Sequence, residues 1–155
     1  MRPRVTQLRK ANEFKMSIVR VLIVDDFRPW QTFVIQELAQ QPDVWVVGLA
    51  SDGLEAILKA DELQPDLILL DVSLPNLSGI EAAREIRKRV PKAKILMLSS
   101  HSDTELMRAA FSAGAEGYVL KWDAGAALLM AIQAVLLGKH FRSPSLIKLD
   151  GLDWP

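Results

Sequence analysis

Residues 67–79 read LILLDVSLPNLSG, and this stretch decides the fold. Its first four residues are apolar, which is typical of a short strand buried on both faces of a parallel sheet. A single carboxylate, Asp71, follows the apolar run at once, and the chain then turns through Pro75, Asn76 and Gly79. We therefore expect a buried strand whose carboxyl end presents an acidic side chain to a loop.

Short apolar segments alternate with segments of helical periodicity from residue 18 onward. Strands are expected at 18–24, 44–50, 67–70, 93–98 and 117–120. Helices are expected at 29–40, after the N-caps Asp52, Ser78 and either Ser102 or Asp103, and at 124–137, with Gly114 and Gly138 ending the last two. The pattern is (βα)5 and predicts the α/β class, as a three-layer, doubly wound parallel sheet with helices on both faces.

Polar residues stand directly after four of the five expected strands. They are Asp25 and Asp26 after the first strand, Asp71 after the third, Ser99 (then Ser100 and His101) after the fourth, and Lys121 after the fifth. Ligands of doubly wound sheets bind beyond the carboxyl ends of the strands, so these side chains are expected to converge at one edge. Each alone has an ordinary role as a cap, a loop hydroxyl or a surface charge, but the joint pattern favours a functional site.

The chemistry of such a cluster is restricted by its charge. Three carboxylates in a small volume repel one another and need positive charge nearby. Lys121 offsets one charge, and a divalent cation bound only by oxygen ligands, Mg²⁺ or Mn²⁺, would offset two more. A metal, a lysine and a hydroxyl also stabilise a transferring phosphoryl group, and a carboxylate can be the nucleophile that forms an aspartyl phosphate.

Four stretches of the chain now have a recognisable character, namely VLIVDD (21–26), LILLDVSLPNLSG (67–79), ILMLSSH (95–101) and AGAEGYVLK (113–121). Together they resemble the receiver domain of two-component response regulators, over roughly residues 18–138. The resemblance implies a flavodoxin-like fold with strand order 2-1-3-4-5. It also implies a switch whose aspartate receives a phosphoryl group from a histidine kinase, with self-catalysed transfer and autodephosphorylation but no other enzymatic activity.

The resemblance implies a role for each residue of the expected site. Asp71 matches the phosphoacceptor, and Asp25 and Asp26 match the acidic pair that holds Mg²⁺ together with it. The backbone carbonyl of Ser73 matches a further metal ligand, and Lys121 matches the lysine of the family.

Two further matches imply a conformational switch. Ser99 matches the hydroxyl that moves to the phosphoryl group, and Tyr118 matches the aromatic residue that then turns inward. The face that responds consists of the fourth helix, the fifth strand and the fifth helix of the (βα)5 pattern, and it commonly forms homodimers in the family. In this chain that face would draw on Ala109, Ala113 and Glu116.

The chain departs from the family pattern after the lysine, where Trp122 replaces a common proline. A cis bond before a residue other than proline costs roughly 3 kcal/mol, so a trans bond or a differently shaped loop is expected. Ser73 and His101 flank the acceptor and the switch hydroxyl. We expect them to influence how fast water reaches the phosphoryl group, with His101 tuning the lifetime of the phosphorylated state; the alternative is an ordinary exposed loop histidine.

The two ends differ from the middle of the chain in character. Residues 1–16 are expected to form a disordered basic leader, with the alternative of an arm that touches an acidic partner. Residues 17–138 are expected to form the receiver domain, and residues 139–155 a linker or C-terminal extension. The first 17 residues carry a net charge of +4 and the remainder −4. An acidic body is a poor non-specific ligand of DNA, so no direct DNA binding by this chain is expected.

Composition adds few restrictions. The chain has 155 residues, half of them hydrophobic, and no cysteine, which fits a reducing cytoplasm. No apolar run approaches the roughly 18 residues of a membrane span, so no membrane contact is expected. The segment GKHFRSPSLI (138–147) resembles the start of a linker to a helix-turn-helix output domain. A transcription regulator and a stand-alone receiver that acts by protein–protein interaction or phosphotransfer both stay open.

Three other functions compete with the switch. A phosphohydrolase with an aspartyl-phosphate intermediate would resemble DxDx(T/V) after the first strand, where this chain has DDFRP with Phe27 in place of the second aspartate. A nucleotide-binding protein would need a glycine-rich phosphate loop after that strand, and none is present. A scaffolding pseudo-receiver would have lost the acceptor or the acidic pair, and both are present.

Overall fold

The strands form one parallel sheet in the order β2-β1-β3-β4-β5-β6. The computed structural model describes residues 17–146, and the expected leader 1–16 and the end of the extension, 147–155, lie outside the described residues. Within that range the strands are β1 (Val19–Val24), β2 (Val44–Ala50), β3 (Leu67–Asp71), β4 (Lys94–Ser99), β5 (Gly117–Leu120) and β6 (Phe141–Arg142). The helices are α2 (Arg28–Ala39), α3 (Gly53–Leu63), α4 (Gly79–Arg89), α5 (Thr104–Ser112) and α6 (Ala124–Leu136), with a short 3₁₀ turn, η1 (Lys121–Asp123), before α6.

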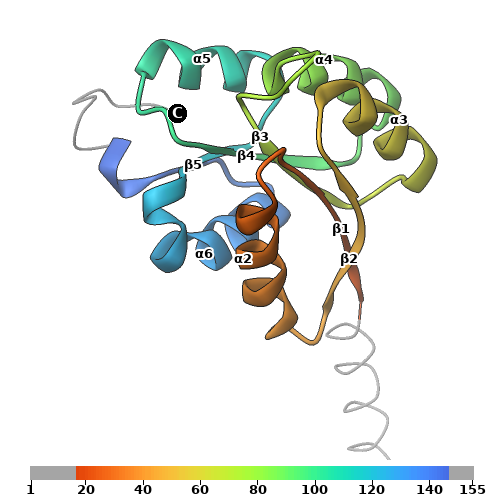
Figure 1. Ribbon diagram of the computed structural model, residues 1–155. Helices are drawn as coiled ribbons and strands as arrows, with labels where there is room; N and C mark the ends of the chain where they lie inside the picture. Colours follow the sequence, from red (N-terminus) through yellow and green to blue (C-terminus); the bar gives the residue numbers. More distant parts are fainter. Residues whose placement is uncertain (1–16, 147–155) are drawn as a thin grey trace, which may run out of the picture.

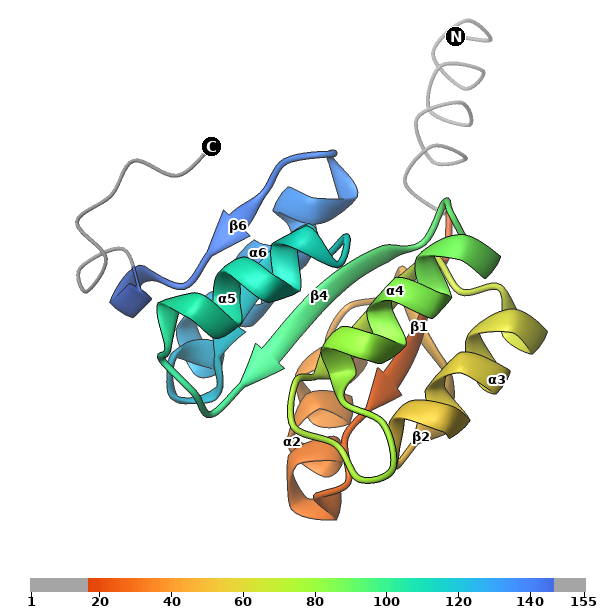
Figure 2. The same cartoon turned by 90° about the horizontal axis from the view of Figure 1, so that it is seen from above.

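Helices cover both faces of this sheet, as the two views in Figures 1 and 2 show: α2 and α6 lie on one face, and α3, α4 and α5 on the other. The central strand β3 alternates between the two layers, because Leu67 and Leu69 pack in one core and Ile68 and Leu70 in the other. This alternation requires an apolar residue at every position of the strand, which is the pattern of its sequence. The predicted three-layer α/β fold is confirmed.

The helix starts follow local capping rules. The side chain of Asp52 accepts a hydrogen bond from the Glu55 amide (2.8 Å) at the start of α3. Ser78 accepts from the Glu81 amide (3.2 Å) at the start of α4, and at α5 the cap is Asp103. Each satisfies a backbone donor that has no partner inside its helix. Among the described residues, no helix is long and apolar enough to cross a membrane.

The sixth strand is an addition to the five that the sequence predicts in the order 2-1-3-4-5. The sequence predicts a linker or extension at residues 139–155, but within this segment β6 pairs in parallel with β5 at the edge of the sheet. The Ser143 amide donates to the Tyr118 carbonyl (2.9 Å), and Leu146 is fully buried. A two-residue strand has no periodicity of its own, so only its tertiary pairing reveals it.

The carboxylate of Asp123 holds this segment from the side. Its Oδ1 accepts a hydrogen bond from the Ser145 hydroxyl (2.8 Å), and its Oδ2 accepts from the Ser145 amide (3.3 Å) and from the Ser143 hydroxyl. Hydrogen bonds to an ionised acceptor are stronger than neutral ones. The turn η1, which begins with Lys121, is therefore tied to the segment that leads out of the domain.

Replacing Asp123 with alanine should loosen that segment without unfolding the domain. Loss of the carboxylate removes the three hydrogen bonds to Ser143 and Ser145, so the Ser143 amide should exchange its hydrogen roughly tenfold faster or more. Hydrogen exchange resolved to single amides measures this. The exposed Asp43→Ala serves as the matched control; equal Ser143 exchange in both variants would contradict the prediction.

Candidate functional site

Three carboxylates meet at the carboxyl edge of the sheet. Asp25 and Asp26 directly follow β1, and Asp71 is the last residue of the neighbouring β3. One carboxylate oxygen from each lies within 4.8 Å of the others. Asp25 and Asp71 are buried, whereas Asp26 is exposed. The structure thus brings together the acidic residues that the sequence predicts for the site.

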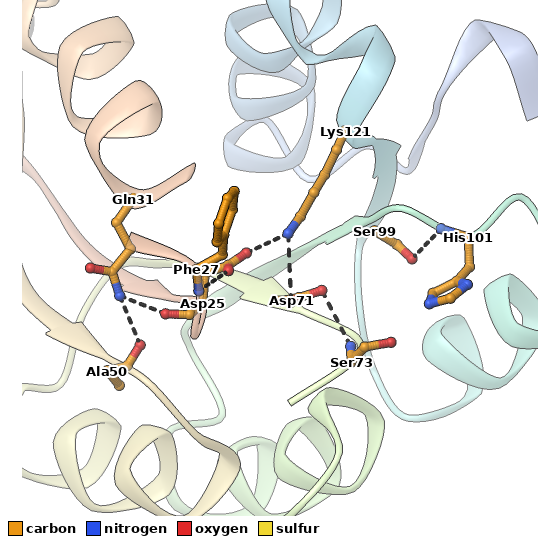
Figure 3. Close-up of polar contacts among 9 residues, drawn as sticks. All are labelled: Asp25, Phe27, Gln31, Ala50, Asp71, Ser73, Ser99, His101 and Lys121. Atoms are coloured by element: carbon orange, nitrogen blue, oxygen red, sulfur yellow. Dashed lines mark hydrogen bonds and ion pairs between the residues drawn. The ribbon is translucent and has the colours of Figure 1, made fainter. Parts of the chain in front are cut away.

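The ammonium group of Lys121 bridges the two buried carboxylates (Figure 3). Its Nζ lies 2.6 Å from Asp25 Oδ2 and 3.6 Å from Asp71 Oδ2. Lys121 reaches them from the start of η1, directly after β5. Burying two like charges side by side is costly unless an opposite charge pairs with them, and the lysine provides that charge.

The loop after β1 is held by a residue that the sequence analysis did not select. Gln31 is buried, and its Nε2 donates to the Asp25 carbonyl (2.5 Å) and to the Ala50 carbonyl (3.5 Å). The Phe27 amide donates to Asp25 Oδ1 (2.8 Å). These contacts orient the Asp25 carboxylate toward Lys121. A signal was present in the sequence, because Gln31 falls on the buried face of α2 with Val34 and Leu38.

The loop after Asp71 is shaped by a close approach of the backbone. A Cβ at position 79 would lie 1.9 Å from the Asp71 carbonyl oxygen, so only glycine fits there. The Gly79 amide donates to the Val72 carbonyl (2.8 Å), and the Ser73 amide donates to Asp71 Oδ1 (3.2 Å). Gly79 thus lets α4 begin directly against the end of β3, where the loop secures the Asp71 side chain.

Burial changes the acidity of Asp71. The pKa of its carboxyl is raised from 3.8 to about 6, first by the loss of hydrating water and then by the charge of Asp25, while Lys121 opposes the shift. The stabilisation that Lys121 gives to the ionised carboxylate is therefore smaller than the cost of desolvation and of repulsion by Asp25. Near neutral pH the group is still largely ionised and available as a nucleophile.

A chain of hydrogen bonds runs from the end of β4 to β5. Ser99 is fully buried, and its Oγ accepts from the His101 amide (3.0 Å). The His101 carbonyl accepts from the hydroxyl of Tyr118 (3.0 Å), whose ring is fully buried, so this aromatic residue lies in the inward orientation. Desolvation raises the pKa of the Tyr118 hydroxyl. The sequence directed attention to the His101 side chain, but its backbone joins the two expected switch residues.

An open cleft of about 590 Å³ lies beside Asp26. Ser73 and His101, the two residues expected to tune the site, both line it. It is lined by Asp26, Val72, Ser73, Leu74, Pro75, Ser78, Ile80, His101, Asp103 and Leu106. His101 is exposed and lines the same cleft as Ser73. Of the three clustered carboxylates, Asp26 is the one that lines this cleft.

The segment after Lys121 follows the expectation drawn from its sequence. Among residues 17–146 no peptide bond is cis, so Lys121–Trp122 is trans. The chain forms the turn η1 instead, and Trp122 is 59% exposed.

The donor set fits a hard divalent cation. Three clustered carboxylates, one of them exposed to solvent, suit Mg²⁺, which retains several waters and prefers few protein ligands. Mg²⁺ would contribute positive charge to the oxygens of a bound phosphoryl group. The raised pKa of Asp71 comes first from desolvation and then from the charge of Asp25. It agrees with this fit, because a bound cation would stabilise the ionised carboxylate against both effects.

A parallel sheet with three acidic side chains, a lysine and a buried hydroxyl at its carboxyl edge defines a class of signalling domain, and comparison with known proteins gives the family. The response regulator receiver domain family matches residues 21–133. The chain is 35% identical over 129 residues to response regulator protein VraR of Staphylococcus aureus, which covers 83% of this chain and 62% of VraR. The chain belongs to the response regulator receiver domain family.

Solved structures agree with this assignment. A LuxR-family two-component response regulator from Aurantimonas sp. SI85-9A1 has a TM-score of 0.81 and 36% identity, covering 85% of this chain and 94% of that chain. The isolated REC domain of RcsB from Salmonella enterica serovar Typhimurium, in the presence of the phosphomimetic BeF3⁻, has a TM-score of 0.79 and 27% identity, covering 85% and 98%. Members of the family are signalling proteins of two-component systems rather than classical enzymes.

Replacing Asp71 with asparagine should stabilise the metal-free protein at pH 7. The folded-state pKa of Asp71 lies above its unfolded value, so the folded state binds more protons and the free energy of unfolding falls as pH rises from about 4 to about 6. Asparagine removes that loss, with an expected gain of about 2 kcal/mol at pH 7 that shrinks toward pH 4. Urea unfolding in EDTA at both pH values measures it.

The matched control for this experiment is Asp43→Asn, a change of an exposed carboxylate on a loop. It should alter the free energy of unfolding by no more than about 0.5 kcal/mol at either pH. A destabilised Asp71→Asn protein at pH 7, or a gain that is equal at both pH values, would contradict the electrostatic account.

Proposed function

We propose that this chain is a phosphorylation-dependent switch that receives a phosphoryl group on Asp71 from a histidine kinase. The observation that carries the proposal is the Asp71 carboxylate, buried at the end of β3 with the Lys121 ammonium 3.6 Å away and the carboxylates of Asp25 and Asp26 beside it. This is the arrangement in which a carboxylate nucleophile and an anionic phosphoryl group can share one volume.

Each residue has a role in the transfer. A carboxylate oxygen of Asp71 attacks phosphorus as the bond from phosphorus to the kinase histidine breaks, and the imidazole leaves with the bonding electrons. Lys121 pairs with a phosphoryl oxygen, and the Ser99 hydroxyl donates to another. Asp25, Asp26, Asp71 and the backbone carbonyl of Ser73 would hold the Mg²⁺ (or Mn²⁺).

The hydrogen-bonded chain at Ser99 supports a route from the site to the surface. When the Ser99 hydroxyl turns to a phosphoryl oxygen, the His101 amide loses its acceptor, and the His101 carbonyl is the partner of Tyr118. The phosphoryl group therefore shifts the equilibrium between the inward and outward positions of Tyr118. This shift changes the face formed by α5, β5 and α6. We assign homodimerisation to this face, which includes Ala109, Ala113 and Glu116.

The output is proposed to be transcription control in the cytoplasm, through an output domain distinct from the receiver domain of residues 17–146. Support comes from the LuxR-family relative and from RcsB, whose dimers bind two parallel DNAs in one solved structure. The docked segment 141–146 contacts Tyr118 and Asp123 and would transmit the switch to whatever follows. A stand-alone receiver that acts on protein partners is the second candidate, favoured by the exposed Trp122.

Phosphorylation of the purified chain tests the proposal. With Mg²⁺ and acetyl phosphate, the wild-type protein should acquire one phosphoryl group, seen as a shifted band on a phosphate-affinity gel and as added mass. Asp71→Asn should not shift, and EDTA should abolish the shift in the wild type. A shift that persists in Asp71→Asn would contradict the assignment, and steady turnover of unrelated phosphate esters would favour a phosphohydrolase.

The lifetime of the phosphorylated state should depend on the His101 side chain. This imidazole lines the cleft beside Ser73 and Asp26, so His101→Ala should admit water and accelerate dephosphorylation by roughly threefold. The backbone hydrogen bonds of residue 101 remain in the variant. Loss of label after removal of acetyl phosphate measures the rate, with the exposed His140→Ala as matched control; equal rates in His101→Ala and wild type would remove the idea.

A further inference from the structure

The indole of Trp30 lies beside the site lysine, a contact that no motif of the sequence predicts. The Nζ of Lys121 lies 5.0 Å from the centroid of the Trp30 ring. This is within the distance at which an ammonium group is attracted to the face of an aromatic ring, and tryptophan is the strongest partner for it. By sequence Trp30 was only an apolar position of the helix at 29–40.

The indole completes the surroundings of the Lys121 ammonium. Asp25 Oδ2 lies at 2.6 Å and Asp71 Oδ2 at 3.6 Å from Nζ, and the Trp30 ring is the third neighbour. The lysine side chain is only 16% exposed. Because solvent is largely excluded, the attraction between the ring and the ammonium is less weakened by hydration than at an open surface.

Trp30 is itself held firmly in the first turn of α2. Its amide donates to the Phe27 carbonyl (3.1 Å), and Pro29 at the helix start restricts the backbone. Its ring packs on Phe33 with centroids 5.0 Å apart. The next residue, Gln31, donates to the Asp25 carbonyl. One helical turn therefore orients both a carboxylate partner of Lys121 and its aromatic neighbour.

We propose that Trp30 is a positioning residue that holds the Lys121 ammonium at the site for phosphoryl transfer; this rests on the proposed function. A phosphoryl oxygen at Asp71 would compete with Asp25 for the ammonium and draw it away from Asp25. A hydrogen bond is lost by such a shift, whereas the attraction to a ring face is tolerant of direction. Trp30 keeps the Lys121 ammonium in place in both the unphosphorylated and the phosphorylated protein and shields it from water.

The contact can be observed directly in the unphosphorylated full chain. Protons above an indole face are shifted upfield, so the ε-methylene resonances of Lys121 should lie upfield of those of the other lysines in a spectrum of ¹³C-lysine protein. Lys121→Arg identifies the signal by its loss. Trp30→Leu should return it to the ordinary position, and Trp30→Phe should keep part of the shift. A Lys121 signal that Trp30→Leu leaves unchanged would overturn the proposal.

The functional consequence is measured by the rate of labelling with acetyl phosphate at limiting concentration. Trp30→Leu should be labelled roughly fivefold more slowly, and Trp30→Phe should stay within about twofold of wild type because a ring face remains. The phenylalanine change is a fair control, since the buried Trp30 Nε1 has no hydrogen-bond partner in the described part of the chain. Circular dichroism and urea unfolding establish that both variants fold.

The two proposals fail differently. A wild-type protein that takes up no phosphoryl group would overturn the proposed function, while the lysine resonances would still report the Trp30 contact. Equal labelling rates in folded Trp30→Leu and wild type would overturn the positioning role and leave Asp71 as the acceptor. Slower labelling of Trp30→Leu together with a near-normal rate for Trp30→Phe supports the positioning role. If Trp30 only filled space, an apolar leucine would serve as well as an aromatic ring.

Discussion

The pairing of the Lys121 ammonium with two buried carboxylates is the interaction on which the rest of the site depends. Asp25 and Asp71 are nearly inaccessible to solvent, and their negative charges would repel each other strongly without Lys121 between them. Desolvation of the buried Asp71 carboxyl, followed by the charge of Asp25, raises its pKa, although Lys121 opposes the shift. The fold therefore holds a buried carboxylate whose negative charge is only partly compensated, which favours the binding of a further cation.

The sheet makes this arrangement possible by its topology. Asp71 ends the strand β3, which lies beside β1, so the carboxylates of Asp25 and Asp26 at the end of β1 stand next to it. Buried apolar residues on both faces make the strand rigid and fix where the carboxylate stands. The close approach of Gly79 to the Asp71 backbone then lets the loop fold back over the site. Stability and function share the same residues at this edge.

A continuous series of contacts links the site to the outer edge of the domain. The Ser99 hydroxyl accepts from the His101 amide, the His101 carbonyl accepts from the Tyr118 hydroxyl, and the Tyr118 carbonyl accepts from the Ser143 amide on the sixth-strand segment. A second link runs from Lys121 through the short turn η1 to Asp123, which binds Ser143 and Ser145. A change at Ser99 or Lys121 thus has short physical routes to the segment beyond β5.

The sequence by itself determined the five alternating strand and helix units, the helix caps and the acidic and basic residues at the strand ends, because periodicity, capping and strand termination are local properties. Tertiary structure alone decided the sixth strand, the anchoring of Asp25 by Gln31, and the contact between Trp30 and Lys121. It also decided the shifted pKa of Asp71. These features depend on distances and solvent exclusion between residues far apart in the chain, which no local pattern records.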